Sequence, residues 1–346
     1  MNSMYYVGLD IHKKVIAICV KNKEGDIVEQ KTIASSRGEL GRWAASMDRP
    51  WLGAMEATLF TGWIYDFLKP YARELKVGHP LLIRAIAASK KKNDKVDAGK
   101  IADLLRCNLL PECYMAPQEI RDLRRALRWR NLIVRQSVRM QNKTHGLLME
   151  VGVEYNKKRL KGKKYFRELL DNLSDVPRSI APLLKLTRQG VDFFQSLQKG
   201  VKDQLVKHPL LKERVARLMS IGGVGEITAL TWALEVGEPQ RFSSISKAVS
   251  YCGLCSAQNS SAGKEYRGPI SKQRNKHLQT VLIEAAKLAP HFNNELARLR
   301  DLELKRGNKN QATLAVARRL AGYLLSVDKS GGDFQSRPRE SEKQSA

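Results

Sequence analysis

The sequence predicts an α/β domain at its N-terminal end, followed by a longer and mainly helical region. Two observations lead to this prediction. Within residues 1–115, short apolar and β-prone runs alternate with helical patterns. From Pro117 onward, long helical periodicities dominate and arginine recurs in them. The chain has 346 residues, which is enough for two or three compact units rather than one.

The N-terminal elements follow a definite order. Three strands are expected over residues 5–9, 15–20 and 27–33. A helix over about 38–47, a strand over 52–55, a helix through Trp63 to Leu68, a strand over 75–78 and a further helix come next. This order is the layout of an RNase H-like α/β domain, to which we assign residues 1–115. In such a sheet the first and fourth strands are neighbours.

A long helix is expected from Pro117, because proline suits the first helical turn and apolar or uncharged residues then recur every three or four positions. The recurring positions are Ile120, Leu123, Leu127, Asn131, Val134, Val138, Gln141, His145 and Leu148. Arginine occupies the other faces, and almost no acid follows Asp122 to neutralise it. For this coiled-coil region, residues 116–209, we therefore favour a nucleic-acid contact surface over a plain soluble arm. The contact residues expected on the helix are Arg121, Arg124, Arg125, Arg128, Arg135 and Arg139.

A second basic segment, NKKRLKGKKY, runs from Asn156 to Tyr165. Clustered cations next to an aromatic residue suit phosphate contacts with some base stacking. The expected contact residues are Lys157, Lys158, Arg159, Lys163 and Lys164. A C-terminal domain is expected over residues 210–327. Residues 328–346 are rich in Gly, Ser, Pro and charge, which is typical of a disordered tail.

The net charge indicates the class of partner. The chain has 61 Lys and Arg against 35 Asp and Glu, a balance of +26, and nucleic acid is the leading candidate for such a surplus. No apolar run approaches the roughly 18–20 residues that span a bilayer, and no signal peptide is visible. We therefore expect a cytoplasmic, nucleoid-associated protein. Five cysteines without a secretory signal suggest reduced thiols, and Cys252 and Cys255 are interpreted as small buried apolar residues rather than a metal or redox pair.

Four carboxylates carry the clearest chemical signal. Asp10 ends the first strand and Glu56 ends the fourth, so the two would lie side by side. Asp94 and Asp97 open a helix after the fifth strand, and their three-residue spacing puts them on one helical face. Singly, Asp94 would be a helix cap and Asp97 a surface charge. Together, the four acids favour a site for Mg²⁺ or Mn²⁺ that acts on a phosphodiester.

Two segments of the C-terminal domain are further candidates. The glycine-rich turn at Gly222–Gly225 opens an apolar helix and is typical of a helix-hairpin-helix, in which the backbone at Gly223 and Gly225 grips DNA; a plain tight turn is the alternative. The serine-rich segment around residues 259–264 is followed by cations that could screen a phosphate. From these residues alone a flexible surface loop is favoured over catalysis. The cations include Lys264, Arg267 and Lys272.

Seven short motifs, in order along nearly the whole chain, resemble one family. The chain is similar to the DEDD transposases of the insertion-sequence "one-ten" group, the bridge-RNA-guided recombinases related to the Piv DNA invertase. The matching segments are Gly8–Lys13 (GLDIHK), Met55–Thr58 (MEAT), Asn93–Ala98 (NDKVDA), Gly222–Gly225 (GGVG), Arg241–Phe242 (RF), Tyr251–Leu254 (YCGL) and Ile270–Lys272 (ISK).

The resemblance implies specific roles. It makes Asp10, Glu56, Asp94 and Asp97 the metal site of a RuvC-like domain. The family's catalytic serine lies eight residues after the glycine of the YCGL-type motif, which is Ser261 here, beside Ser260. Ser261 would attack DNA and form a transient phosphoserine link to a 5′ end. Such enzymes work as dimers or tetramers, and a non-coding bridge RNA pairs with donor and target DNA.

The sequence therefore predicts an RNA-guided, Mg²⁺-dependent DNA recombinase with a serine nucleophile. One alternative is a Holliday-junction nuclease that hydrolyses DNA with the metal site alone. Another is a nucleic-acid-binding protein without catalytic activity.

Overall fold

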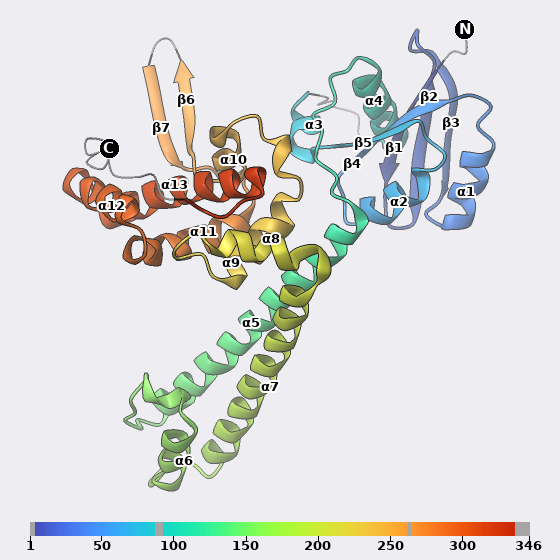
Figure 1. Ribbon diagram of the computed structural model, residues 1–346. Helices are drawn as coiled ribbons and strands as arrows, with labels where there is room; N and C mark the ends of the chain where they lie inside the picture. The colour runs from blue at the N-terminus through green and yellow to red at the C-terminus, as the bar shows by residue number, and fades with distance from the viewer. Residues whose placement is uncertain (1–3, 87–92, 262–263, 336–346) are drawn as a thin grey trace, which may run out of the picture. The chain divides into compact units, whose positions relative to one another are not determined.

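The computed structural model describes residues 4–86, 93–261 and 264–335, and the chain divides into two compact units, Met1–Gln118 and Glu119–Ala346. Figure 1 shows the mixed sheet of the first unit and the helices of the second. Among the described residues, no helix has the length and apolar character needed to cross a bilayer.

The first unit is built on a five-stranded sheet in the order β3-β2-β1-β4-β5. The strands β1, β2 and β3 are antiparallel neighbours, whereas β1, β4 and β5 run parallel. The predicted order of elements and the predicted pairing of the first and fourth strands are confirmed. The strands are β1 Tyr5–Ile11, β2 Val15–Lys21, β3 Ile27–Ala34, β4 Trp51–Glu56 and β5 Glu74–Gly78.

The two faces of this sheet are covered differently. One face carries large apolar side chains of the strands, such as Leu9 and Trp51, and packs against the first two helices, which contribute buried residues such as Trp43. The other face is covered by α4, which contacts β1, β2 and β4 through small residues such as Ala98. The helices of the unit are α1 Arg37–Ala45, α2 Thr61–Leu68, α3 Pro80–Ile86 and α4 Asp94–Arg106.

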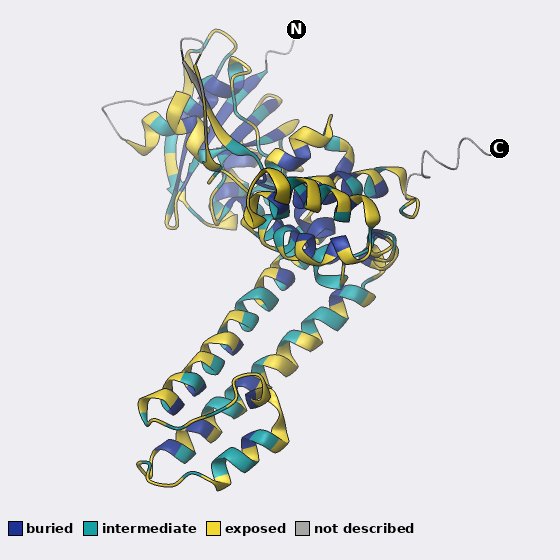
Figure 2. Ribbon diagram, turned by 90° about the vertical axis from the view of Figure 1, so that its left-hand side faces the viewer, coloured by how far each residue is buried: buried dark blue, intermediate teal, exposed yellow. Residues whose placement is uncertain are grey.

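The second unit begins with a helical arm. Its elements are α5 Gln118–Glu150, η1 Arg159–Lys161, α6 Lys163–Asp171 and α7 Ile180–Lys207. The long helix from Pro117 is therefore confirmed, but the predicted apolar seam is wrong at Val138, which is 46% exposed. Figure 2 shows few buried positions along these helices. Several of the buried positions on α5 are polar: Ser137 and Thr144 are buried, and the Thr144 hydroxyl donates to the Thr187 hydroxyl on α7 at 3.0 Å.

The rest of the second unit is a helical body around a buried core. Trp232 is fully buried within this core. Its helices are α8 Pro209–Met219, α9 Glu226–Val236, η2 Pro239–Arg241, α10 Ile245–Tyr251, α11 Lys276–Leu288, η3 Ala289–His291, α12 Asn294–Arg306 and α13 Lys309–Ser330. A two-stranded hairpin, β6 Ser256–Ser261 and β7 Lys264–Ile270, interrupts them where the sequence predicts surface loops. The segment lacks the apolar alternation that marks a strand, so the backbone pairing could not be recognised from the pattern.

The last helix extends past the predicted boundary at residue 327. Asp328 lies within α13 and its side chain is only 3% exposed. It accepts hydrogen bonds from Arg214 at 2.7 Å and from the Trp232 indole at 2.9 Å. Residues 328–330 are therefore part of the folded body rather than of a tail. The predicted tail from 336 to 346 lies outside the described residues.

Candidate active site

Strand alternation turns Asp10 toward α4. Residues 7, 9 and 11 of β1 point into the large apolar core, so residues 8 and 10 point to the opposite face. Gly8 makes that face accessible: a Cβ at this position would lie 1.9 Å from the Ala98 carbonyl oxygen and 2.5 Å from the Ala102 nitrogen. The backbone of α4 thus rests directly on β1, and its first turn lies near Asp10.

The first turn of α4 carries the other two aspartates. The Asn93 side chain accepts a hydrogen bond from the Lys95 N–H at 3.0 Å and so caps the helix. Asp94 and Asp97 follow in the first turn, where the free N–H groups of a helix favour negative charge. Because Asn93 caps the helix and α4 begins at Asp94, both acids lie in the turn that is next to the end of β1.

A histidine joins these acids, and the sequence interpretation missed it. His12 Nε2 lies 3.1 Å from Asp10 Oδ2 and 3.5 Å from Asp94 Oδ1. One donor atom from each of the three side chains lies within 4.8 Å of the others. The available signal was the histidine of the GLDIHK motif, two positions after Asp10 and hence on the same face of the strand.

Glu56 and Asp97 lie outside this close group. Leu9 is paired with Met55, so Asp10 and Glu56 both follow at the same end of two adjacent parallel strands, as predicted. Asp97 instead forms an ion pair with Lys100 at 3.0 Å. The four acids therefore belong to one end of the unit, but only Asp10 and Asp94 are drawn together with His12.

The pKa values of Asp10 and Glu56 are both raised. Burial raises the pKa of Asp10 above its ordinary value; His12 opposes the shift, and the charges of Asp94 and Asp97 add to it. Burial also raises the pKa of Glu56, with a further contribution from Asp10. No lysine or arginine of the described residues forms an ion pair with Asp10 or Asp94. Carboxylates that repel one another in this way suit a hard divalent cation.

The predicted nucleophile lies in the second unit, at the tip of the hairpin. Ser261 ends β6 and is paired with Lys264, the first residue of β7. The base of the hairpin is tied by the Ser271 N–H, which donates to the Cys255 carbonyl at 3.0 Å. Lys264 and Lys272 are exposed. Ser261 is thus the last residue of β6, with a lysine across from it on β7.

An ion pair with a buried carboxylate connects the segments that flank this hairpin. Glu235 is 1% exposed and accepts two hydrogen bonds from the Arg128 guanidinium, at 2.8 and 2.7 Å. Burial alone would raise the pKa of Glu235, but hydrogen bonds from Arg128 and Asn275 and the nearby arginine charges outweigh it and lower that pKa. Asn275 caps α11 and the Tyr251 hydroxyl donates to the Glu235 carbonyl, so both flanks of the hairpin are bound to one residue.

The expected nucleic-acid contacts fall into two groups. Arg124 and Arg128 are committed to the fold, to the Leu234 carbonyl and to Glu235, so they neutralise the acid that the sequence pattern did not reveal. Gly223 has a φ of +89° and packs against η3. Gly225 precedes α9 and is exposed with open space around its α-carbon. The exposed cations are Arg125, Arg135, Arg139, Lys157, Lys158, Arg159, Lys163, Lys164, Lys264 and Lys272.

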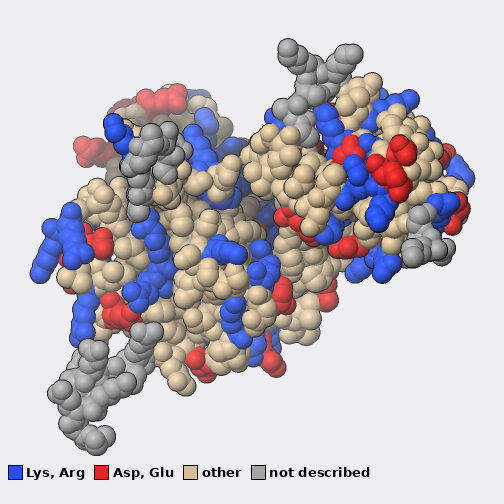
Figure 3. All heavy atoms as spheres, turned by 90° about the horizontal axis from the view of Figure 1, so that it is seen from above, with Lys and Arg blue, Asp and Glu red and all other residues tan. Residues whose placement is uncertain are grey.

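Arg121 is half-buried, and Arg125 pairs with Asp122 at 3.0 Å. Figure 3 shows lysine and arginine recurring over the viewed surface, with acids between them.

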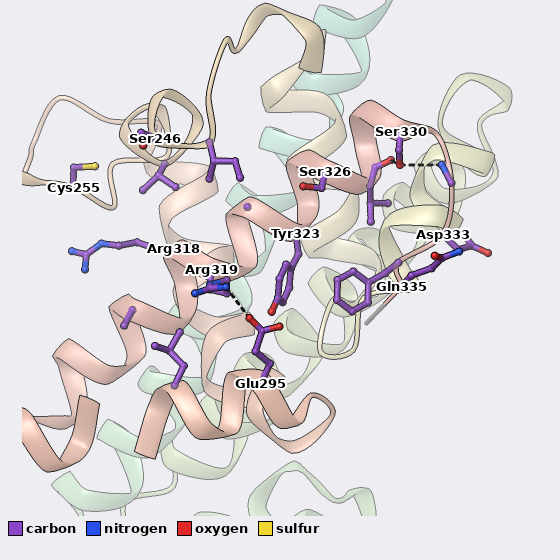
Figure 4. Close-up of a pocket in the computed structure, with 18 residues that line it drawn as sticks. Ser246, Cys255, Glu295, Arg318, Arg319, Tyr323, Ser326, Ser330, Asp333 and Gln335 are labelled. Atoms are coloured by element: carbon purple, nitrogen blue, oxygen red, sulfur yellow. Dashed lines mark hydrogen bonds and ion pairs between the residues drawn. The ribbon is translucent and has the colours of Figure 1, made fainter. Parts of the chain in front are cut away.

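A large cavity of about 970 Å³ lies elsewhere in the helical body, between α10, α12, α13 and residues 332–335 (Figure 4). Arg319 pairs with Glu295 on its wall at 2.8 Å, and Phe334 packs against Tyr323 with ring centroids 4.8 Å apart. None of the predicted site residues lines it. Cys252 is buried in the core as predicted, and burial raises the pKa of its thiol to about 12, whereas Cys255 is only partly buried.

Comparison with known proteins gives matches over both units. Residues 7–152 match the family model of the DEDD transposases of the IS110 type, and residues 215–300 match that of the transposase IS116/IS110/IS902 family. The chain is 24% identical over 340 residues to a transposase for insertion sequence element IS1328 of Yersinia enterocolitica, covering 96% of this chain and 99% of that protein.

Two further transposases are similar to the chain over most of its length. A probable family 20 transposase of Pseudomonas aeruginosa is 26% identical over 339 residues, covering 93% of this chain and 96% of that protein. A transposase for insertion sequence element IS1111A of Coxiella burnetii is 25% identical over 337 residues, covering 94% and 90%.

Proposed function

Because the chain belongs to the IS116/IS110/IS902 transposase family, we propose that it cuts and exchanges DNA strands with Ser261 as nucleophile and with Mg²⁺ or Mn²⁺ held by Asp10, Glu56, Asp94 and Asp97. The observation that supports this most is the convergence of Asp10 and Asp94 on one point at the end of β1, with Glu56 on the neighbouring strand. A DEDD transposase domain implies a divalent metal, and the oxygen donors here fit one.

The chemistry divides between the two units. A divalent cation held by the acids would neutralise charge on the phosphate and on the leaving oxygen. In the serine step, a bond forms between the Ser261 oxygen and phosphorus, and the bond from phosphorus to the 3′ oxygen breaks. The serine loses its proton and the 3′ oxygen gains one, which leaves the 5′ end on the protein. Lys264, paired with Ser261 across the hairpin, contributes positive charge beside the phosphate.

Guidance by a non-coding bridge RNA, paired with donor and target DNA, is part of the proposal. The tip of the arm supports it. A cavity of about 250 Å³ there is lined by His145, Lys157, Lys161 and Arg188, among others. Arg159 lies over the Tyr165 ring at 4.7 Å, and Lys157, Lys158 and Lys163 are exposed beside it. Exposed cations around an aromatic ring suit a nucleic acid with unpaired bases. The turn between α8 and α9 is a further proposed DNA contact, with Gly225 at the helix start.

Association of copies into dimers or tetramers also belongs to the proposal. Leu183, Leu186, Phe193 and Leu197 follow one another on α7 at steps of three, seven and four residues and are between 41% and 63% exposed. An apolar stripe with this spacing, on a long helix, suits packing against another helix. Replacing Leu186 and Phe193 by lysine should therefore lower the mass measured by light scattering.

Two variants test the proposed reaction. Asp10→Asn and Ser261→Ala should each abolish strand exchange on a labelled DNA junction, while binding of that DNA persists in a mobility-shift assay. If Ser261→Ala still nicks the DNA, the protein is a hydrolytic nuclease. If both variants keep full activity, neither site performs the reaction.

A further inference from the structure

We propose that His12 is a direct ligand of the metal held by the acids of β1 and α4, and that its imidazole biases this site toward Mn²⁺ over Mg²⁺. The inference rests on the proposed metal site and adds a nitrogen donor to it. It also gives a role to the histidine of the GLDIHK motif, which the four-acid description leaves without one.

The spacing of the donor atoms is that of ligands on one ion. His12 Nε2 is 3.1 Å from Asp10 Oδ2 and 3.5 Å from Asp94 Oδ1. Neighbouring ligands of an octahedral ion with bonds of about 2.1 Å lie about 3 Å apart, and opposite ligands about 4 Å apart. All three donor atoms lie within 4.8 Å of one another, so small side-chain adjustments would bring them around one cation.

The backbone holds the ring in this position. β1 and β2 stay paired up to Ile11 and Ile16, and the His12 N–H donates to the Val15 carbonyl at 2.9 Å. His12 therefore continues the line of β1, two residues after Asp10 and on the same face. That face is the one on which the first turn of α4 rests, because Gly8 allows the close approach. The position of the ring follows from the same packing that brings Asp94 to Asp10.

The ring's surroundings favour ligation over a purely structural hydrogen bond. The His12 side chain is 49% exposed and that of Asp94 is 52% exposed, so a contact between them contributes little to stability. Both side chains lie beside Asp10, with the carboxylate of Asp97 in the same helical turn as Asp94. A cation would neutralise these neighbouring carboxylates, and a neutral imidazole offers it a lone pair from Nε2 when Nδ1 carries the proton.

The donor type predicts the selectivity. Mg²⁺ prefers oxygen ligands and retains several waters, whereas imidazole binds the later divalent metals better. Removal of the His12 imidazole should therefore weaken Mn²⁺ binding by about tenfold or more, the scale on which metal sites respond to the removal of a supporting side chain, and change Mg²⁺ binding much less.

The test uses the full chain and Mn²⁺ itself. Free Mn²⁺ is measured by its electron paramagnetic resonance signal during titration, with Mg²⁺ as competitor. Spin-echo modulation then reports any nitrogen bound to the metal. Wild type should show ¹⁴N modulation, while His12→Gln and His12→Ala should lose it and bind Mn²⁺ about tenfold or more weakly. The matched control is His291→Gln, an exposed histidine of η3, which should behave as wild type.

The outcomes separate the two claims. Asp10→Asn should abolish Mn²⁺ binding; if it does and both His12 variants keep ¹⁴N modulation and wild-type affinity, the histidine ligand is overturned but the acid site stands. If wild type binds no Mn²⁺, or Asp10→Asn binds as well as wild type, the acid site itself is wrong and His12 with it. Thermal unfolding of each variant without metal shows that the chain is folded. Because His12 is replaced by both a polar and a small residue, failure of one variant to fold leaves the other as the test.

Discussion

The two proposed catalytic elements are supported in different ways. The acids lie at the end of a five-stranded sheet, with apolar core on one face and the backbone of α4 pressed onto the other. Ser261 lies at the tip of a two-stranded hairpin, and a lone hairpin is marginal in water. Packing therefore fixes the positions of the acids, whereas the position of Ser261 depends on the segments that flank the hairpin and on what the hairpin binds. We expect the hairpin to become more stable when it binds DNA or a second copy of the chain.

The largest effect should come from Gly8→Ala, which tests whether the packing of α4 on β1 fixes the acids. The new Cβ would meet backbone atoms of Ala98 and Ala102, which cannot give way like a side-chain tip. Overpacking of this kind costs about 3 kcal/mol, and any shift of α4 carries Asp94 away from Asp10. Chemical denaturation should report the lower stability, and Mn²⁺ titration the weaker binding. Gly38→Ala is the matched control, because nothing lies within 4 Å of a Cβ there; a control variant as impaired as Gly8→Ala would contradict this explanation.

Arg128→Ala tests the support of the hairpin. Breaking a buried ion pair costs about 3–5 kcal/mol. We expect about 2 kcal/mol here, because Arg128 is half exposed and Asn275 still donates to Glu235. Arg135→Ala, an exposed arginine of the same helix, should unfold like wild type. Equal stability of Arg128→Ala and wild type would show that the pair does not hold the hairpin roots.

The same pair predicts a pH dependence. The pKa of Glu235 is lowered below its ordinary value of 4.5, so its contribution to stability is complete above that value and is lost as pH falls through the folded-state pKa. The free energy of unfolding of the second unit should therefore fall in acid. Glu235→Gln should be less stable near neutral pH and should lose less stability on acidification. If Glu235→Gln loses as much unfolding free energy on acidification as wild type, other groups cause the pH dependence.

Hydrogen exchange compares the two regions directly. Amides of β1 and β4 should exchange more slowly than those of β6 and β7 by about 10³-fold or more, since the sheet opens only with its unit and the hairpin opens locally. Addition of DNA should slow the exchange of the hairpin amides and leave the exchange of the sheet amides nearly unchanged. Equal protection of both regions in the free protein would show that sheet and hairpin are equally stable.

The smallest effect should come from the arm. Replacing Lys157, Lys158 and Lys163 by alanine removes exposed charges without touching the fold. The slope of log affinity against log salt should flatten by about 0.7 to 0.9 for each lysine that binds a phosphate in the wild type. Glu154→Ala and Glu150→Ala serve as charge-changing controls on the same arm. An unchanged slope would place the nucleic-acid interface elsewhere. Arg124 and Arg128 are unsuitable for this test, because the fold needs them.

Strong local patterns made the first unit predictable. The apolar runs of β1, β2 and β4 and the order of elements were enough to place Asp10 beside Glu56. What the sequence did not reveal depends on contacts between distant residues. Glu235 lies 107 positions from Arg128, so the arginine face of α5 looked free. The hairpin has a polar sequence and is held by backbone pairing, and His12 meets Asp94 only through the packing of α4 on Gly8.

The central claim is that a metal-dependent serine attack occurs at Ser261. The most direct test is to react the full-length protein with DNA and Mg²⁺, digest the DNA, and locate the remaining nucleotide on the protein by mass spectrometry. We predict a nucleotide on Ser261 that disappears without divalent metal and in Asp10→Asn. A nucleotide on Ser260, or cut DNA with no adduct on the protein, would contradict the claim.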